Sequence, residues 1–292
     1  MFLPHELIIQ ILLRLPVKSL IHFKCVCKLW FSLISHDTHF ASLHFQLNST
    51  THTSRILFLS NSTHEALSID FEASLHDDTA SVSLNLPEDF RGFEIRGSCR
   101  GFILFCSSLN IYLWNPSTGI HKQIPLSPFA SNLDAEYFYG FGYDDSTDDY
   151  FVVSMSRHDS EEPPLHLEYF SLKSNTWKEV EGPHFPYNFQ EDDPKCGLLY
   201  KGAIHWLGFR YDLQTDVILA FDLIERKLSY MLLPTDSDGS PLEWDGEDGL
   251  VKYDTSGQCL EQHSYPNYDL SGLTMYIDSL LSLPSDGHNQ QA

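Results

Sequence analysis

The sequence predicts two domains, a short helical domain followed by an all-β domain. Apolar residues keep helical spacing to about residue 45, and short β-favouring runs separated by turn residues replace that spacing from Arg55 onward. The 292 residues are 42% apolar and 13% aromatic, which is enough for a sizeable core. We expect a helical domain at 1–47, a linker at 48–54, a β domain at 55–283 and a disordered tail at 284–292.

The helical domain begins with a short amphipathic helix. Its apolar stripe consists of Leu7, Ile8, Ile11, Leu12 and Leu15. Pro4 suits the first turn, where its missing N–H would have no partner anyway, and Pro16 ends the helix. The apolar pattern from Val17 to Ile34 covers too many faces for one helix, so we expect two there and three in all. A unit of this size buries its apolar surface poorly and needs a partner.

Two runs in this domain carry a family resemblance. They are Leu3-Pro4-x-Glu6-Leu7-x-x-x-Ile11-Leu12-x-Arg14-Leu15-Pro16-Val17-Lys18-Ser19-Leu20 and Phe23-Lys24-Cys25-Val26-Cys27-Lys28-x-Trp30. Residues 2 to about 45 resemble the plant F-box. The resemblance implies that this domain docks on the Skp-type adaptor of SCF (Skp, cullin, F-box) ubiquitin ligases, and through the adaptor on the cullin. The alternative is a helical cap that packs on the β domain and binds no other protein.

On this reading, one group of residues contacts the adaptor and another joins the helices together. The expected adaptor contacts are Leu3, Pro4, Leu7, Ile11, Leu12, Leu15, Pro16 and Leu20. Val26, Trp30 and Leu33 are expected to form the core of the helical domain.

The β domain is predicted from nine β-favouring runs. They are Arg55–Ser60, Ser81–Leu86, Gly101–Cys106, Ile111–Trp114, Phe151–Ser154, Leu167–Leu172, Ala203–Leu207, Val217–Asp222 and Leu228–Leu233. Turn sequences such as Asn115–Gly119, Asp144–Thr147 and Lys201-Gly202 separate them, which is typical of hairpins.

A weak repeat runs through these strands. Apolar strands end in a polar residue at Ile69-Asp70, Trp114-Asn115, Phe170-Ser171 and Phe221-Asp222, at intervals of about 50 residues. Blades of kelch-like propellers repeat at this period, so we expect a β-propeller. The segment from Ile56 to Leu283 supplies only about four to five blades where kelch-like propellers carry about six. The polar stretch from Pro234 to Asp248 marks the expected position of a missing blade.

Several motifs in the β domain resemble the F-box-associated domain of plant F-box proteins. They are Gly97-Ser98-Cys99-Arg100-Gly101, Trp114-Asn115-Pro116-Ser117-Thr118-Gly119, Tyr139-Gly140-Phe141-Gly142-Tyr143-Asp144, Trp177-Lys178, Gly202-x-x-His205-Trp206 and Phe221-Asp222-Leu223. This domain is similar to kelch propellers, and the family includes the S-locus F-box proteins of pollen.

Charge is distributed unevenly between the two domains. Residues 1–47 hold four basic and two acidic side chains, whereas the rest of the chain holds 14 basic and 38 acidic ones. Such an acidic surface argues against nucleic acid and favours a basic partner surface, although solvation of loops explains it equally well. The sequence contains no 18-residue apolar run and no basic residues before an apolar leader, so we expect no membrane association and a cytoplasmic or nuclear location.

Motifs that resemble catalytic or metal sites are weak. Gly97–Gly101 mimics a nucleophile elbow but precedes a strand rather than a helix, and Tyr139–Tyr143 lacks the third glycine of a dinucleotide loop. Asp144 to Asp149 lacks calcium-loop spacing and is interpreted as a solvated turn. Cys25 and Cys27 are expected to pack as small apolar side chains rather than to bind metal. We therefore expect neither a catalytic site nor a cofactor.

These observations predict a non-catalytic substrate receptor of an SCF-type ubiquitin ligase, whose β domain binds an unidentified target protein. Two alternatives remain. A carbohydrate-binding F-box protein would use aromatic platforms such as Trp206, Phe209 and Tyr211. A kelch-fold metalloenzyme would need a copper-binding cluster of tyrosine and histidine.

Overall fold

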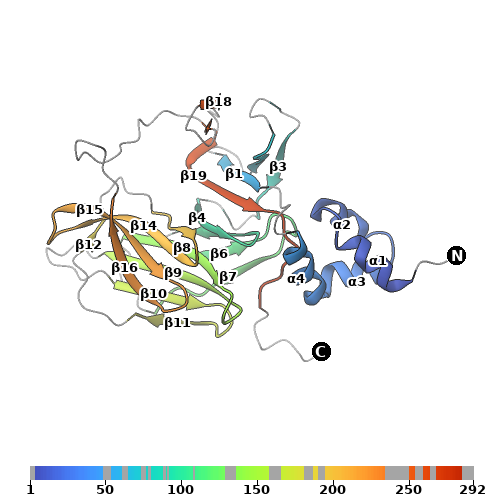
Figure 1. Cartoon of the computed structure of the whole chain (residues 1–292), viewed down its shortest axis with the longest axis horizontal. Coiled ribbons are helices and arrows are strands. Elements are labelled where there is room, and N and C mark those ends of the chain that lie inside the picture. Colours follow the sequence, from blue (N-terminus) through green and yellow to red (C-terminus); the bar gives the residue numbers. More distant parts are fainter. Residues whose placement is uncertain are drawn as a thin grey trace.

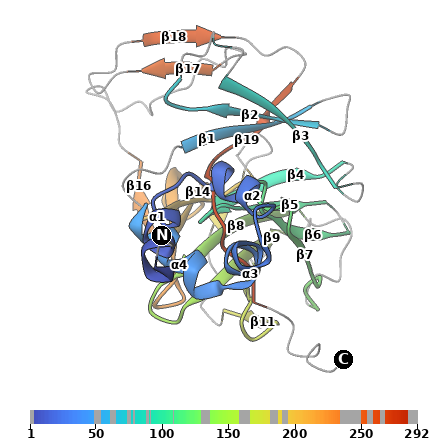
Figure 2. The same cartoon turned by 90° about the vertical axis from the view of Figure 1, so that its right-hand side faces the viewer.

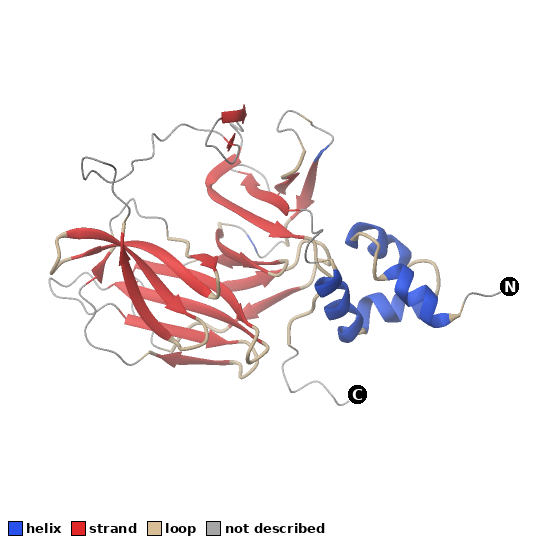
Figure 3. Ribbon diagram, viewed as in Figure 1, coloured by secondary structure: helices blue, strands red, loops and turns tan. Residues whose placement is uncertain are grey.

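Helices and strands lie at opposite ends of the molecule (Figure 1, Figure 3). The computed structural model describes residues 4–48, 54–60, 65–73, 77, 80–87, 90, 92–107, 109–128, 136–157, 166–180, 187–189, 195–233, 250–253, 259–263 and 268–284. Most of the expected linker at 48–54, the tail beyond residue 284 and the polar stretch from Pro234 to Asp248 lie outside these ranges.

The helical end contains four helices rather than the predicted three. They are α1 (His5–Leu12), α2 (Val17–Phe23), α3 (Lys28–His36) and α4 (Thr38–Leu47). Pro4 and Pro16 are the N-cap residues of α1 and α2. The unpredicted helix, α4, begins where the Asp37 carboxylate accepts a hydrogen bond from the backbone N–H of Phe40 at 2.9 Å. This helix lies between the rest of the helical end and the strands (Figure 1).

The remainder of the described chain is β-structure. Its strands are β1 (Ser54–Ser60), β2 (Glu65–Asp70), β3 (Ser81–Asn85), β4 (Glu94–Cys99), β5 (Phe102–Cys106), β6 (Ile111–Trp114), β7 (His121–Ile124), β8 (Glu136–Asp144), β9 (Asp149–Arg157), β10 (His166–Ser171), β11 (Thr176–Glu179), β12 (Tyr187–Asn188), β13 (Leu198–Tyr200), β14 (Ala203–Arg210), β15 (Thr215–Asp222), β16 (Lys227–Leu232), β17 (Leu250–Tyr253), β18 (Cys259–His263) and β19 (Tyr268–Ile277). All nine predicted runs coincide with strands, namely β1, β3, β5, β6, β9, β10, β14, β15 and β16.

The strands form antiparallel sheets that follow the chain order. Two sheets are simple meanders, β4 to β7 and β8 to β11, and a third has the order β12-β14-β15-β16, with β13 also paired to β14. The sheet of β1, β2 and β3 is completed by β19, which pairs with β1 and so joins the two ends of the domain. β17 and β18 form a two-stranded sheet, which lies on the same side of the molecule as β1 and β2 (Figure 2).

Two hairpins have the backbone geometry that the sequence indicates. Arg100 and Gly101 join β4 to β5 with φ values of 52° and 86°, and Lys201 and Gly202 join β13 to β14 with φ values of 49° and 78°. Two consecutive residues with positive φ are typical of the type I′ turns that connect twisted strands. The motif Gly97–Gly101 is therefore part of a hairpin, as predicted, and leads into a strand rather than a helix.

One apolar core extends through both ends of the molecule. Leu20 and Phe40 of the helices belong to the same cluster of buried side chains as Phe102, Phe141 and Leu280 of the β domain. The helical end is therefore packed onto the strands and is not an independent domain connected only by a linker. None of the described helices is long and apolar enough to span a membrane.

Candidate functional site

Helix α1 is apolar on two opposite faces. Leu12 and the following residue, Leu13, are 1% and 2% exposed and face the core. Leu7 and Ile11, four residues apart on one face of the helix, are 50% and 51% exposed. A helix that only covered the strands would need one apolar face, so the second face is available for a partner.

Other large apolar side chains are exposed on the same helical end. They are Val26, Leu29, Phe31 and Leu47. A hollow of about 470 Å³ lies beside Leu29, lined by His5 at the start of α1 and by Leu29 and Leu33 of α3. Because α1 and α3 lie at the end of the molecule away from the strands, this surface is accessible to another protein (Figure 1).

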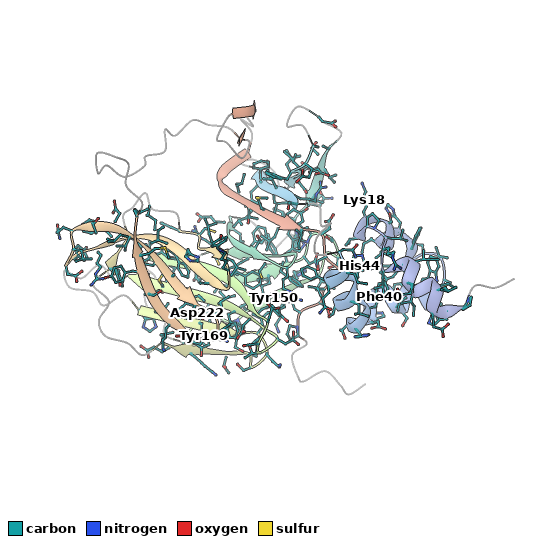
Figure 4. The ribbon with its side chains drawn as sticks, viewed as in Figure 1. Lys18, Phe40, His44, Tyr150, Tyr169 and Asp222 are labelled. Carbon is teal, nitrogen blue, oxygen red and sulfur yellow. The ribbon has the colours of Figure 1, made fainter. Side chains whose placement is uncertain are left out.

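Side-chain hydrogen bonds connect α4 and its C-cap residue to the chain just after α1. The ring of His44, only 2% exposed, lies with Nε2 2.8 Å from the carbonyl oxygen of Leu15. The side-chain amide of Asn48 donates to the carbonyl oxygens of Leu13 and His44 at 2.9 and 2.7 Å. The contacts with Leu13 and Leu15 give partners to backbone carbonyls that follow the last residue of α1. Figure 4 shows His44 and Phe40 in the part of the helical end nearest the strands.

The predicted adaptor contacts separate into three groups. Pro4, Leu7, Ile11 and Pro16 are exposed, and Leu15 is half-buried. Leu12 and Leu20 are 1% and 0% exposed, so these two predictions require correction: both side chains lie in the core, where no partner can reach them. Leu3 lies outside the described residues.

The predicted helical core also needs one correction. Trp30 and Leu33 are half-buried, and the Trp30 ring packs on Phe23 with their centroids 5.5 Å apart. Val26 is 59% exposed, because it follows the end of α2 and precedes α3 rather than lying on the inner face of either helix. Cys25 and Cys27 are exposed as well, so their predicted packing is wrong.

Arg100 connects the helical end to the strands. Its guanidinium carbon lies 4.8 Å from the ring centroid of Phe45 on α4 and 3.8 Å from that of Tyr143 on β8. A guanidinium between two aromatic faces is attracted to both, which adds to the apolar contact across the junction. Arg100 thus joins the hairpin of β4 and β5 to both α4 and β8.

One of the three aromatic side chains named for the carbohydrate-binding alternative is buried. Trp206 is 2% exposed, and its indole N–H donates to the carbonyl oxygen of Tyr139 at 3.2 Å. Tyr211 is exposed and Phe209 half-buried, with their rings 5.7 Å apart in an edge-to-face arrangement. Stacking on a sugar needs an open aromatic face, which Trp206 does not offer.

The acidic turn after β8 is not simply solvated, contrary to the prediction. Asp144 and Asp149 are 2% and 4% exposed. Asp144 accepts hydrogen bonds from Ser146 and Thr147 and from the Arg226 guanidinium at 2.9 Å. Burial alone would raise the pKa of Asp144, but these hydrogen bonds outweigh burial and hold the pKa well below its usual range.

The buried thiol of Cys99 and the half-buried thiol of Cys196 have little nucleophilic character. Burial raises the pKa of Cys99 to about 12 and that of Cys196 to about 11, so neither forms much thiolate near neutral pH. Within the described ranges, no three side chains of histidine, cysteine, aspartate and glutamate are grouped as metal ligands would be.

Comparison with known proteins identifies both parts. Residues 2–40 match the F-box domain, and residues 49–255 match the F-box associated beta propeller domain. The chain belongs to the F-box-associated family of F-box proteins. The F-box is therefore the part that contains α1 to α3, and α4 continues from it toward the F-box-associated domain.

The F-box protein is similar to several proteins of Arabidopsis thaliana. It is 32% identical over 225 residues to an F-box/kelch-repeat protein, covering 70% of this chain and 60% of that one. It is 29% identical over 257 residues to F-box protein CPR1, covering 80% of this chain and 60% of the relative. The chain thus spans about 60% of the length of these relatives. Among solved structures, a dipeptidyl peptidase 4 of Porphyromonas gingivalis aligns with a TM-score of 0.36 and 10% identity over 73% of this chain and 40% of that one.

Three features of this region were not predicted from the sequence. Leu29 and Phe31 are exposed and were not among the predicted contacts, although each is a large apolar residue in a short unit that needs a partner. Helix α4 was not predicted, although Asp37 is a good N-cap residue. The contact of Arg100 with Phe45 joins distant parts of the chain, and no local pattern indicates it.

Proposed function

We propose that this F-box protein is the substrate-recognition subunit of an SCF-type ubiquitin ligase and is not itself a catalyst. Its exposed helical face docks on the Skp-type adaptor, and its β domain holds a target protein near the ubiquitin-charged enzyme. Holding the target there raises its effective concentration, which is the contribution of a receptor subunit.

The observation that carries this proposal is the second apolar face of α1. Leu7 and Ile11 are half exposed although Leu12 on the other side of the same helix is buried. Covering the exposed halves of Leu7 and Ile11 would contribute about 1.5–3 kcal/mol together, since full burial of such a side chain contributes about 1.5–3 kcal/mol. That energy corresponds to roughly ten- to hundred-fold in affinity.

The β domain is proposed to be a kelch-like propeller with a reduced set of blades. The meanders β4 to β7 and β8 to β11 have the size and connectivity of blades, and β19 returns to pair with β1, as closing strands of propellers do. The excess of acidic over basic side chains beyond residue 47 favours a target with a basic surface.

The experiment compares adaptor binding by the full chain and by two double variants. In Leu7→Ala/Ile11→Ala, affinity for a purified Skp-type adaptor should fall roughly ten- to hundred-fold, measured by isothermal titration. The matched control is Leu109→Ala/Ile120→Ala, which removes two side chains that are 57% and 43% exposed in the β domain. The control should bind as the unaltered chain does.

Circular dichroism distinguishes lost docking from lost folding. Because Leu7 and Ile11 are exposed, the double variant should retain its helical signal and melting temperature to within a few degrees. Undiminished adaptor affinity in a folded Leu7→Ala/Ile11→Ala chain would contradict the proposal.

A further inference from the structure

A cavity of about 190 Å³ lies where the helical end meets the sheet of β1, β2 and β3. One wall comes from Val17 and Ile21 of α2, and the opposite wall from Leu84 on β3 and Tyr276 on β19. For comparison, an apolar cavity of about 150 Å³ accommodates a benzene ring. The cavity therefore has room for a small ring with one further group, and it is too small for a drug-sized ligand.

Basic side chains surround this cavity. Lys18, His22 and Arg55 all line it, whereas Asp278 is its only acidic lining residue among the described part of the chain. Figure 4 shows Lys18 on the side of the helical end that faces β3. This local excess of basic groups is unusual in a molecule with a formal net charge of −22. Because salt screens charges beyond about 8 Å, the groups that line the cavity dominate the field that a bound ligand would experience.

The acidic group of the cavity is already hydrogen-bonded. The carboxylate of Asp278 accepts a hydrogen bond from the Ser117 hydroxyl at 2.8 Å. Among the described residues, neither Lys18, His22 nor Arg55 forms an ion pair. Within the described residues, Asp278 is therefore the only carboxylate that lines the cavity, beside the side chains of Lys18, His22 and Arg55.

Two hydrogen bonds to Ser68 hold the guanidinium of Arg55 in place. Its Nε donates to the Ser68 hydroxyl at 2.7 Å, and its Nη2 donates to the Ser68 carbonyl at 3.1 Å. The Ser68 hydroxyl is also 2.7 Å from the hydroxyl of Tyr276, and both Ser68 and Tyr276 are buried. A guanidinium has five N–H donors, so these bonds orient the group and leave donors for an acid.

We propose that this cavity binds a small organic anion, consisting of an apolar body about the size of a benzene ring and one phosphate or carboxylate group. The body lies between Val17, Ile21 and Leu84, and the acid is bound by Arg55 and Lys18. Since α2 and β3 belong to opposite ends of the molecule, the bound anion also stabilises their junction. Adaptor binding through Leu7 and Ile11 is not required for this site.

Phenyl phosphate is the test ligand, with phenol and inorganic phosphate as its two halves. Binding to the full chain is measured by isothermal titration and saturation-transfer NMR at up to about 5 mM ligand. A ligand of this size is expected to bind with a Kd of about 1 mM or lower. Phenyl phosphate should bind at least about tenfold more tightly than phenol or phosphate. Equal affinity for phenyl phosphate and phenol would overturn the proposal, as would the absence of binding.

Variants locate the site. Lys18→Gln and Arg55→Gln should each weaken phenyl phosphate about tenfold, whereas Lys28→Gln, an exposed lysine on α3 outside the cavity, should change nothing. If Arg55→Gln unfolds the chain, Val82→Phe replaces it, because this partly exposed residue on β3 lines the cavity and a larger side chain there fills it. Unchanged affinity in both Lys18→Gln and Val82→Phe would show that the ligand binds elsewhere. None of these residues belongs to the α1 face, so failure here leaves the adaptor test unaffected.

Discussion

The side-chain amide of Asn115 donates a hydrogen bond to the main-chain carbonyl of Leu281 at 3.2 Å, across 166 residues of sequence. The same amide donates to the carbonyl of Ser279 at 3.0 Å, and the side-chain oxygen Oδ1 of Asn115 accepts from the N–H of Ser117 at 2.9 Å. Asn115 is fully buried, and Leu280 and Leu281 beside it join the core shared with the helices. One side chain thus attaches the last described segment to the turn after β6.

Replacing Asn115 by Ala should destabilise the protein by about 1–3 kcal/mol, because buried carbonyls lose their donor. The loss is measured by urea denaturation, and hydrogen exchange should accelerate at residues 279–283. Asn110→Ala is the control, since the Asn110 side chain accepts an exposed hydrogen bond from Gln123 and the loss of this bond should cost less than about 0.5 kcal/mol. Equal stability of the two variants would show that the Asn115 bonds contribute nothing.

Gly140→Ala should destabilise the β domain by about 1–3 kcal/mol through overpacking. An added Cβ would lie 2.7 Å from the Trp206 ring and closer still to the side chain of Ile204. A double-mutant cycle with Ile204→Ala checks the cause, because removing that side chain opens space and should reduce the cost of Gly140→Ala. A cost that is the same in both backgrounds would show that the clash with the Trp206 ring, and not that with Ile204, causes the loss.

Stability should depend on pH through Asp144. Its pKa is lowered on folding, so its carboxylate stabilises the folded state at pH values above about 4, the pKa in unfolded chains, and loses this effect as pH falls toward the folded-state pKa. Asp144→Asn should therefore destabilise the protein at pH 7, with a deficit that shrinks as the pH approaches about 3. Asp145→Asn, at an exposed neighbour, should show little deficit at either pH. Thermal melts across this range provide the measurement.

Hydrogen exchange tests whether a blade is missing. The missing-blade hypothesis predicts weak protection for both β16 and β19, the strands on either side of the expected gap. The pairing of β19 with β1 and the burial of Tyr276 predict instead that β19 is well protected, whereas β16 carries the exposed Met231 and Leu232. Protection in β19 close to that of β5 would contradict the hypothesis of an open gap at that strand.

The strands were largely predictable because each pairs a short apolar run with a recognisable turn. Hairpins such as Arg100-Gly101 need positive φ, and their sequence indicates it. Trp206 was misassigned as a surface platform, although alternation along β14 places it on the same buried side as Ile204.

The helical site was predictable only in outline. An apolar stripe gives no sign of which side faces the core when a helix is apolar on two sides, so Leu12 was grouped with Leu7. Helix α4 was not predicted because its buried face includes His44. This residue is polar, and its ring forms a hydrogen bond with the carbonyl oxygen of Leu15, which is distant in the sequence. The cavity of Lys18 and Arg55 joins α2 to β1, and such a junction exists only after folding.

The core that runs from Leu20 on α2 to Phe102 on β5 has a consequence for damaged molecules. Two domains joined by a flexible linker can unfold separately. A receptor whose β domain had unfolded would then still bind adaptors without delivering a target. Here the inner sides of the helices lose their packing when the strands unfold. If the chain is the receptor proposed above, a heat-damaged copy would release the adaptor together with the target, and an intact receptor would bind the adaptor in its place.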